Sequence, residues 1–228
     1  EGHVRDLTIN INTDIKNKGK FLGLSEKNRK SKNGNPVGLD YLASLGITHL
    51  QLLPVLDYAT VDENNCNGYN WGYDPIQFFT LEGSYSTNPD DPYSRIFEFK
   101  KLVDALHSKS IKVNLDVVYN HVYKPEQFAL SKITPNYFFR FEGEKMADHS
   151  WCGNDFQSER AMARKIIVDS VLYLLKTFDV DGFRFDLMGL LDVDTMNEIT
   201  AKVRKYKGFA MIYGEGWDMF ATSSFGAK

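Results

Sequence analysis

Short apolar stretches alternate along this chain with segments whose apolar residues recur at helical spacing. Five stretches have the length and the β-branched or aromatic content of buried strands, and they cover residues 4–9, 48–55, 111–118, 181–186 and 209–213. Helical periodicity lies between them, at 39–45, at 96–106, from about 158 to 178, and in a segment that Asp194 would cap. Strands that alternate with helices predict βα units and a parallel sheet.

Two folds are built from such units: an open doubly wound sheet and a (β/α)8 TIM barrel. Five strands would complete an open sheet, whereas a barrel requires eight strands and typically about 250 residues. In a barrel, residues 1–228 would therefore form only about the first five βα units of a single catalytic domain. The long connections at about 56–93 and 119–157 follow strand ends, where a barrel gathers its functional loops.

Composition narrows the partners that we expect. The net charge of -3 comes from 27 basic and 30 acidic residues spread along the chain, which predicts a neutral partner and no nucleic acid. No apolar run is long enough to span a membrane, so we expect no membrane partner and a soluble chain, with the bacterial cytoplasm slightly favoured over secretion. Cys66 and Cys152 have no metal-type spacing; two free thiols are favoured, and one disulfide stays open.

Two carboxylates directly follow apolar strands, where a charged side chain without a partner or a function would be unfavourable. Asp186 ends the segment VDGFRFD, with Arg184 on the same side of the strand, and Glu215 follows AMIYG. One strand-helix-strand unit separates them, which places them at the ends of neighbouring parallel strands. A retaining glycosidase uses carboxyl groups about 5 to 5.5 Å apart, one as nucleophile and one as acid/base. We predict Asp186 as the nucleophile and Glu215 as the acid/base, although either could simply cap a loop.

Two further segments would reach the same edge of the sheet. In DVVYNH, Asp116 could hold Arg184 in place, and His121 could donate to a sugar hydroxyl. In YNWGYDP, Trp71 and Tyr73 could form a platform for a glucose ring, or could simply anchor their own loop. The chain has no HxxxH, HExxH or CxxC pattern, so no zinc site is predicted.

Together these segments resemble glycoside hydrolase family 13, the α-amylase family, and within it the type I pullulanase branch. YNWGYDP, DVVYNH, GFRFDLMG and YGEGW stand here in the order of that branch, and GLDYLASLGITHLQLLPV is similar to the stretch that links its first two barrel strands. The resemblance implies hydrolysis of α-1,6 branch linkages in pullulan and branched α-glucans, with retention of configuration. It also implies that Trp71, Tyr73, Asp116, His121, Arg184 and Trp217 surround the substrate.

Two departures from the wider family bear on specificity and completeness. After Asp186 the chain reads Leu187, Met188 and Gly189, where α-amylases commonly carry a Lys-His pair that holds linear glucan, so debranching is favoured. No Asn-His-Asp motif follows Glu215, although the resemblance implies a third catalytic carboxylate there. We therefore expect a barrel completed by the remainder of the same polypeptide or by a complementary chain, with residues 1–228 inactive and prone to aggregate alone.

Other interpretations stay open. One is an α-amylase-family hydrolase with mixed α-1,4 and α-1,6 action, and another is a glucan-binding fragment without catalysis. An unrelated doubly wound binding module would require a phosphate loop such as GxGxxG, which the sequence lacks. No cofactor is expected; calcium is the one ion left open, through Asn120, which could bind it in α-amylase relatives.

Overall fold

Four parallel strands form one sheet in the computed structural model, which describes residues 1–65 and 68–217. The strands are β1 (His49–Leu52), β2 (Lys112–Val117), β5 (Gly182–Phe185) and β6 (Met211–Gly214), and they lie in the order β1-β2-β5-β6. Each strand therefore pairs with the next large strand along the chain. A doubly wound sheet reverses its strand order at a switch point. This sheet has no reversal among the described strands, in agreement with the predicted partial TIM barrel.

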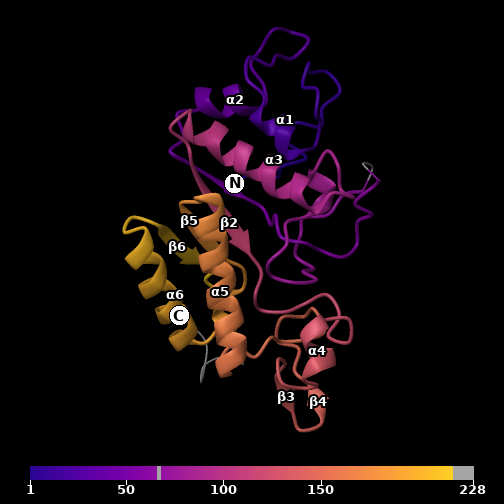
Figure 1. Ribbon diagram of the computed structural model, residues 1–228, viewed down its shortest axis with the longest axis vertical. Coiled ribbons are helices and arrows are strands. Elements are labelled where there is room, and N and C mark those ends of the chain that lie inside the picture. Colours follow the sequence, from indigo (N-terminus) through magenta and orange to yellow (C-terminus); the bar gives the residue numbers. More distant parts are fainter. Residues whose placement is uncertain (66–67, 218–228) are drawn as a thin grey trace.

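One long helix connects each pair of neighbouring strands (Figure 1): α3 (Pro92–His107), α5 (Ala161–Phe178) and α6 (Val193–Tyr206). Asp91 caps α3 by accepting the backbone N–H of Tyr93, and Pro92 occupies its first turn, where no N–H is required. Helix α6 begins at Val193 because Asp192 accepts the backbone N–H of Thr195. The prediction that Asp194 caps this helix was wrong: Asp194 lies in the first turn.

The predicted first strand, at residues 4–9, was also wrong. Only Gly2 pairs with the sheet, through a bridge to Leu52, and the next residues turn back on themselves. The N–H groups of Leu7 and Ile9 bond to His3 and Arg5 instead of to a neighbouring strand. The buried residues Val4 and Thr8 are four apart, which is the spacing of a helical turn and not that of a strand.

Aromatic side chains join the helices into one core. Phe99 of α3 lies 5.1 Å from Phe178 of α5 and 5.0 Å from Phe21 of α1, between ring centroids. Helix α1 spans Phe21–Ser25, and α2 spans Gly38–Ser44, where a helix was predicted at 39–45. Phe183 and Phe185 of β5 are fully buried on the side of the sheet opposite Arg184. The face of the sheet that carries Phe183 and Phe185 is thus the apolar one, and the opposite face carries Arg184 and other polar residues.

The two long connections hold most of the remaining structure. Among the described residues of the first connection, 56–65 and 68–91, the one helix is the short η1 (Gly83–Tyr85). Residues 118–160 contain α4 (Ala129–Ile133) and a hairpin of β3 (Phe141–Glu142) and β4 (Lys145–Met146). Figure 1 shows α4 and this hairpin at the end of the molecule away from α2. A further short helix, η2 (Met188–Leu190), directly follows β5.

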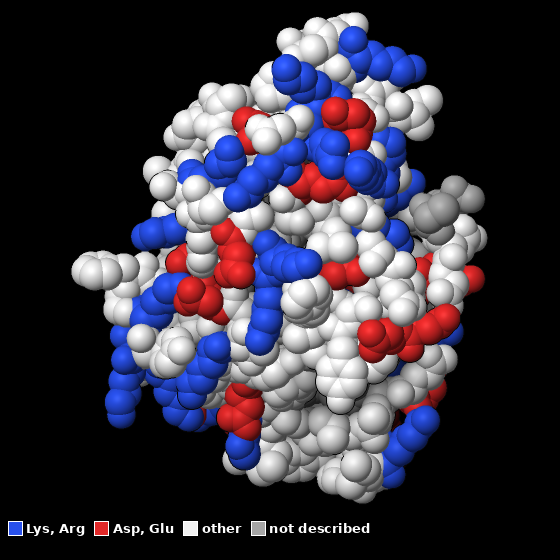
Figure 2. Space-filling view, turned by 45° about the horizontal axis from the view of Figure 1, so that its top comes forward, with Lys and Arg blue, Asp and Glu red and all other residues white. Residues whose placement is uncertain are grey.

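The surface carries both signs of charge. Figure 2 shows one face on which basic and acidic side chains are interspersed, with a mainly uncharged area in its lower part. No helix in the described part of the chain is both long and apolar enough to cross a membrane.

Candidate active site

Strand register brings three acidic segments to one edge of the sheet. Asp116 of β2 pairs with Arg184 of β5, which pairs in turn with Tyr213 of β6. The ladder continues past the strand ends, since Asp186 N–H bonds to Val117 and Glu215 N–H bonds to Phe185. Side chains alternate across a sheet, so Arg184 and Asp186 share a face, and register adds Asp116 and Glu215 to it.

The guanidinium of Arg184 contacts all three carboxylates. Its Nη1 donates to Asp116 at 2.9 and 3.0 Å and to Asp186 at 2.9 Å, and its Nη2 lies 3.3 Å from Glu215. Asp116 is 1% exposed and Asp186 8%. Burial raises the pKa of Asp116 to about 7, against the lowering effects of Arg184 and the Tyr73 hydroxyl. One shared cation therefore stabilises a cluster that would otherwise repel itself.

A neutral donor fixes the second oxygen of Asp186. Asn120 Nδ2 donates to Asp186 Oδ2 and to the Asp186 carbonyl, both at 2.9 Å, and Asn120 is completely buried. Burial raises the pKa of Asp186, while Asn120 and Arg184 oppose this rise. Both carboxylate oxygens thus have fixed donors, as a carboxylate requires in order to stay ionised and oriented.

Glu215 is more accessible and is held by the backbone. The N–H of Leu187 donates to Glu215 Oε2 at 3.1 Å, and the Glu215 side chain is 27% exposed. Leu187 adopts a left-handed conformation with φ 40°, which costs energy for a branched L-residue. The strained turn after Asp186 therefore aims a backbone donor at the second predicted catalytic carboxylate.

Tyr73 and His121 lie beside this cluster but are occupied by protein partners. The Tyr73 hydroxyl donates to Asp116 at 2.8 Å. His121 is 2% exposed, and its two ring nitrogens face Asn120 Oδ1 at 2.6 Å and the Tyr73 carbonyl at 2.9 Å. Burial lowers the pKa of His121, so the neutral ring can donate to only one of these oxygens. For His121 to donate to a sugar, it would have to exchange a protein partner for the hydroxyl.

Aromatic rings lie on the loop whose Tyr73 reaches Asp116 and just after Glu215. Trp71 and Tyr73 help to line an open depression of about 450 Å³, together with Thr60, Tyr69, Asn70 and Asp74. Trp71 is 60% exposed, and Trp217, directly after the Glu215 turn, is 66% exposed. Gly72 between the two rings has φ 92°, and a Cβ there would meet Pro54 at 2.8 Å. Flat rings beside carboxylates suit the apolar faces of sugars.

Known proteins are similar to this chain in sequence and in fold. The profile of the α-amylase catalytic domain matches residues 31–136. A pullulanase of Bacillus subtilis (strain 168) is 48% identical over 221 residues, which cover 96% of this chain and 31% of that protein. The chain belongs to the α-amylase family.

Solved structures of family members match nearly the whole chain. A pullulanase of Paenibacillus barengoltzii in complex with maltohexaose and α-cyclodextrin superposes with a TM-score of 0.92 at 45% identity, covering 95% of this chain and 34% of the other. A pullulanase of Anoxybacillus sp. LM18-11 complexed with maltotriose gives 0.93 at 46% identity, covering 95% of this chain and 31% of the other. The chain thus spans about a third of the length of these relatives.

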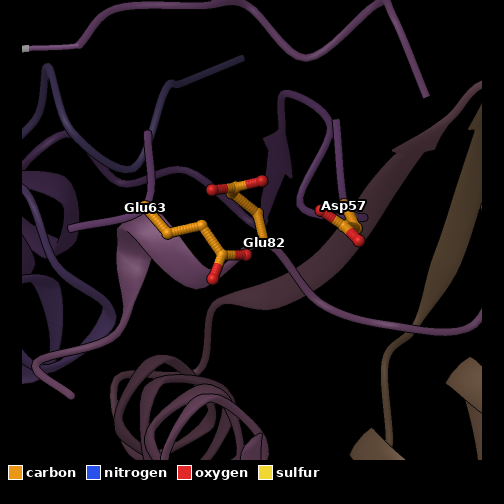
Figure 3. Close-up of side chains that lie close together, drawn as sticks. All are labelled: Asp57, Glu63 and Glu82. Atoms are coloured by element: carbon orange, nitrogen blue, oxygen red, sulfur yellow. The ribbon is translucent and has the colours of Figure 1, made fainter. Parts of the chain in front are cut away.

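A second acidic group in this α-amylase-family chain lies outside the site. Asp57, Glu63 and Glu82 each place an oxygen within 4.8 Å of the others (Figure 3), so by geometry they could hold a cation. All three already have protein partners, and that of Asp57 is Gln77 Nε2 at 3.5 Å. Arg95 pairs with Glu63 at 2.7 Å, and Glu82 accepts backbone N–H groups of Tyr58 and Ser84. Burial raises the pKa of Glu82 to about 7. The contacts with Arg95 and with the backbone join three parts of the loop, which is a structural role.

Two glycines flank Glu215. A Cβ on Gly214 would meet the Met188 side chain at 2.4 Å, so this glycine makes room for the turn after β5. Gly216 has open space around it. Cys152 is a free, exposed thiol, and Cys66 lies outside the described residues. The role of Asn120 as a donor to Asp186 was missed, because one amide in a polar strand end gives no signal of its partner.

Proposed function

We propose that this chain carries the catalytic carboxylates of a retaining glycosidase that cleaves α-1,6 branch linkages in pullulan and related α-glucans. The observation that carries the proposal is the arrangement around Arg184, where one guanidinium contacts Asp116, Asp186 and Glu215 at the carboxyl ends of three neighbouring strands. Active sites of TIM barrels lie at this end of the sheet. The pullulanase relatives support the substrate class.

In the proposed reaction, Asp186 attacks the anomeric carbon, and the bond from that carbon to the bridging oxygen breaks. Glu215 gives its proton to the departing oxygen, then takes a proton from water as the water attacks the glycosyl-enzyme ester and releases Asp186. The two side chains are held differently in a way that suits these roles. Asp186 has fixed donors on both oxygens, whereas Glu215 is more exposed and can exchange protons with water.

The family resemblance supplies the proposed substrate contacts. We assign Trp71 and Trp217 to glucose units beside the reacting one, and Tyr73 and His121 to the reacting unit. Arg184 and Asp116 hold the attacked glucose and each other. The Leu187, Met188 and Gly189 turn leaves no cation after Asp186, which favours branch linkages over the α-1,4 linkages of a mixed-specificity hydrolase.

We further propose that residues 1–228 form part of a catalytic barrel whose other strands come from the remainder of the polypeptide or from a complementary chain. The support is the sheet itself, since β6 has an unpaired edge within the described residues, and Phe209 and Met211 beside it are exposed. The third catalytic carboxylate would lie in the completing segment.

The test is the release of reducing sugar from pullulan by the native protein that contains this chain. Asp186→Asn and Glu215→Gln should each lower kcat by several orders of magnitude, with maltotriose as the product of the unsubstituted protein. Asp169→Asn and Glu198→Gln on exposed helix faces are matched controls and should retain full activity.

Three outcomes would count against the proposal. Near-normal rates in both variants would refute the assigned roles, and release of linear α-1,4 products would favour mixed specificity. Glucan binding with no hydrolysis by the unsubstituted protein would favour the non-catalytic binding function.

A further inference from the structure

We propose that Tyr69 and Asp6 are positioning residues that fix the Trp71 indole as a rigid platform for glucan. This inference rests on the proposed function, which assigns Trp71 to a glucose unit. Neither residue lies in the carboxylate cluster, and Asp6 belongs to the turned segment that replaces the predicted first strand. The inference therefore gives that segment a role in substrate binding.

Hydrogen bonds run in one direction from the indole to the carboxylate. Trp71 Nε1 donates to the Tyr69 hydroxyl at 3.0 Å, and that hydroxyl donates to Asp6 Oδ2 at 2.8 Å. The Tyr69 hydroxyl accepts from Trp71 and donates to Asp6, so the negative charge of Asp6 polarises both hydrogen bonds. The bond to Asp6 also raises the pKa of Tyr69, so the phenol stays protonated and able to donate.

The Tyr69 ring also contacts Arg5 and His3. The guanidinium of Arg5 lies 5.5 Å from the Tyr69 ring centroid, within cation–π range, and the His3 ring lies 5.2 Å away. His3 Nδ1 accepts the N–H of Arg5, so Nε2 carries the proton and donates to the Asn70 carbonyl at 2.8 Å. His3 thus bonds to the backbone of Asn70, and both His3 and Arg5 contact the Tyr69 ring.

This arrangement is unusual for surface aromatics. Tyr69 is 50% exposed and Trp71 60%, yet each polar atom bonds to protein. An exposed ring normally samples several rotamers, and a ligand that stacks on it must fix one of them, which weakens binding. A ring that is already fixed in the free protein avoids this cost and binds sugar more tightly.

A double-mutant cycle tests the inference in the native protein. Tyr69→Phe keeps the ring and removes the hydroxyl, so KM for pullulan should rise about two- to tenfold with kcat nearly unchanged. Asp6→Ala should have a similar effect, and Asp6→Asn, which keeps an acceptor oxygen, a smaller one. Once Trp71→Ala has removed the platform, Tyr69→Phe should add no further rise in KM. Tyr93→Phe, at an exposed tyrosine on α3, is the matched control.

An equal rise in KM with and without Trp71, or no rise at all, would overturn the inference. Fluorine NMR of protein labelled with 5-fluorotryptophan gives a readout that does not require activity. The Trp71 resonance should shift or broaden in Tyr69→Phe and Asp6→Ala but not in Tyr93→Phe, and an unaffected resonance would also overturn it. A protein inactive on pullulan would refute the proposed function while the NMR result still decides the positioning role.

Discussion

Replacing Arg184 by Met should destabilise the strand ends in a way that depends on pH. The side chain is similar in length, but the only cation that contacts Asp116, Asp186 and Glu215 among the described residues is lost. Removing one partner of a buried ion pair leaves the other charge uncompensated and costs about 3 to 5 kcal/mol. The full range applies here because the Asp116 side chain is completely buried and that of Arg184 is only 15% exposed.

The pH dependence follows from the raised pKa values. Burial already holds the pKa of Asp116 at about 7 and raises that of Asp186, and without Arg184 both rise further. A carboxyl with a raised folded-state pKa binds protons more readily in the folded than in the unfolded protein, so stability falls as pH rises. The cost of Arg184→Met should therefore be largest near pH 8 and smaller near pH 4, where Asp116 is protonated in the folded protein and no longer requires a cation.

Hydrogen–deuterium exchange of peptides that cover β2 and β5 measures this loss as local opening, after correction for intrinsic exchange rates. Protection near pH 8 should fall by about two to three and a half powers of ten in Arg184→Met. Lys202→Met removes one cation from the exposed pair with Glu198 and should leave protection nearly unchanged. Equal protection at pH 8, or a loss of the same size at every pH, would refute the reasoning.

Three smaller changes test other parts of the structure. Glu82→Gln removes a carboxyl whose pKa is raised to about 7. Ionisation of this carboxyl lowers the free energy of unfolding by up to about 3 kcal/mol between about pH 4.5 and 7, and the variant should lack this contribution when its unfolding in urea is measured across that range. Asn120→Ala removes a donor to Asp186 and should lower kcat on pullulan about 10- to 100-fold, because a hydrogen bond to a charged group contributes about 1.5 to 3 kcal/mol. Gly72→Ala places a methyl group 2.8 Å from Pro54 at positive φ. It should lower the free energy of unfolding by about 1 to 3 kcal/mol, measured as a lower thermal midpoint.

The convergence of the carboxylates could be predicted from the sequence because it depends on topology. A polar residue directly after each of two successive strands must lie at one edge of a parallel sheet, whatever its rotamer, and Asp186 and Glu215 do so. Alternation within GFRFD likewise placed Arg184 on the face of Asp186. Burial of Phe183 and Phe185 on the opposite face is the reason this register holds.

Features that depend on competition between nearby alternatives could not be predicted. Asp192 and Asp194 are both suitable caps for α6, and the buried bonds of Asp192 to Thr195 decide between them only in the folded protein. Residues 4–9 have strand-like composition, but their N–H groups close a local turn first. The left-handed conformation of Leu187 has no signal in the residue type, since leucine rarely adopts it and tertiary contacts must impose it.

The charge balance of the site explains why this arrangement suits the proposed reaction. Each carboxylate has one neutral donor and a share of Arg184: Asp116 has Tyr73, Asp186 has Asn120, and Glu215 has the backbone N–H of Leu187. In the proposed reaction Glu215 holds its proton when the substrate binds, so Asp116 and Asp186 are the negative groups that share the one cation, and a neutral glucan adds no positive charge. Positive charge does develop on the sugar in the oxocarbenium-like transition state of glycoside hydrolysis. The fixed negative groups therefore favour the transition state over the bound substrate, which is the condition for acceleration of the chemical step.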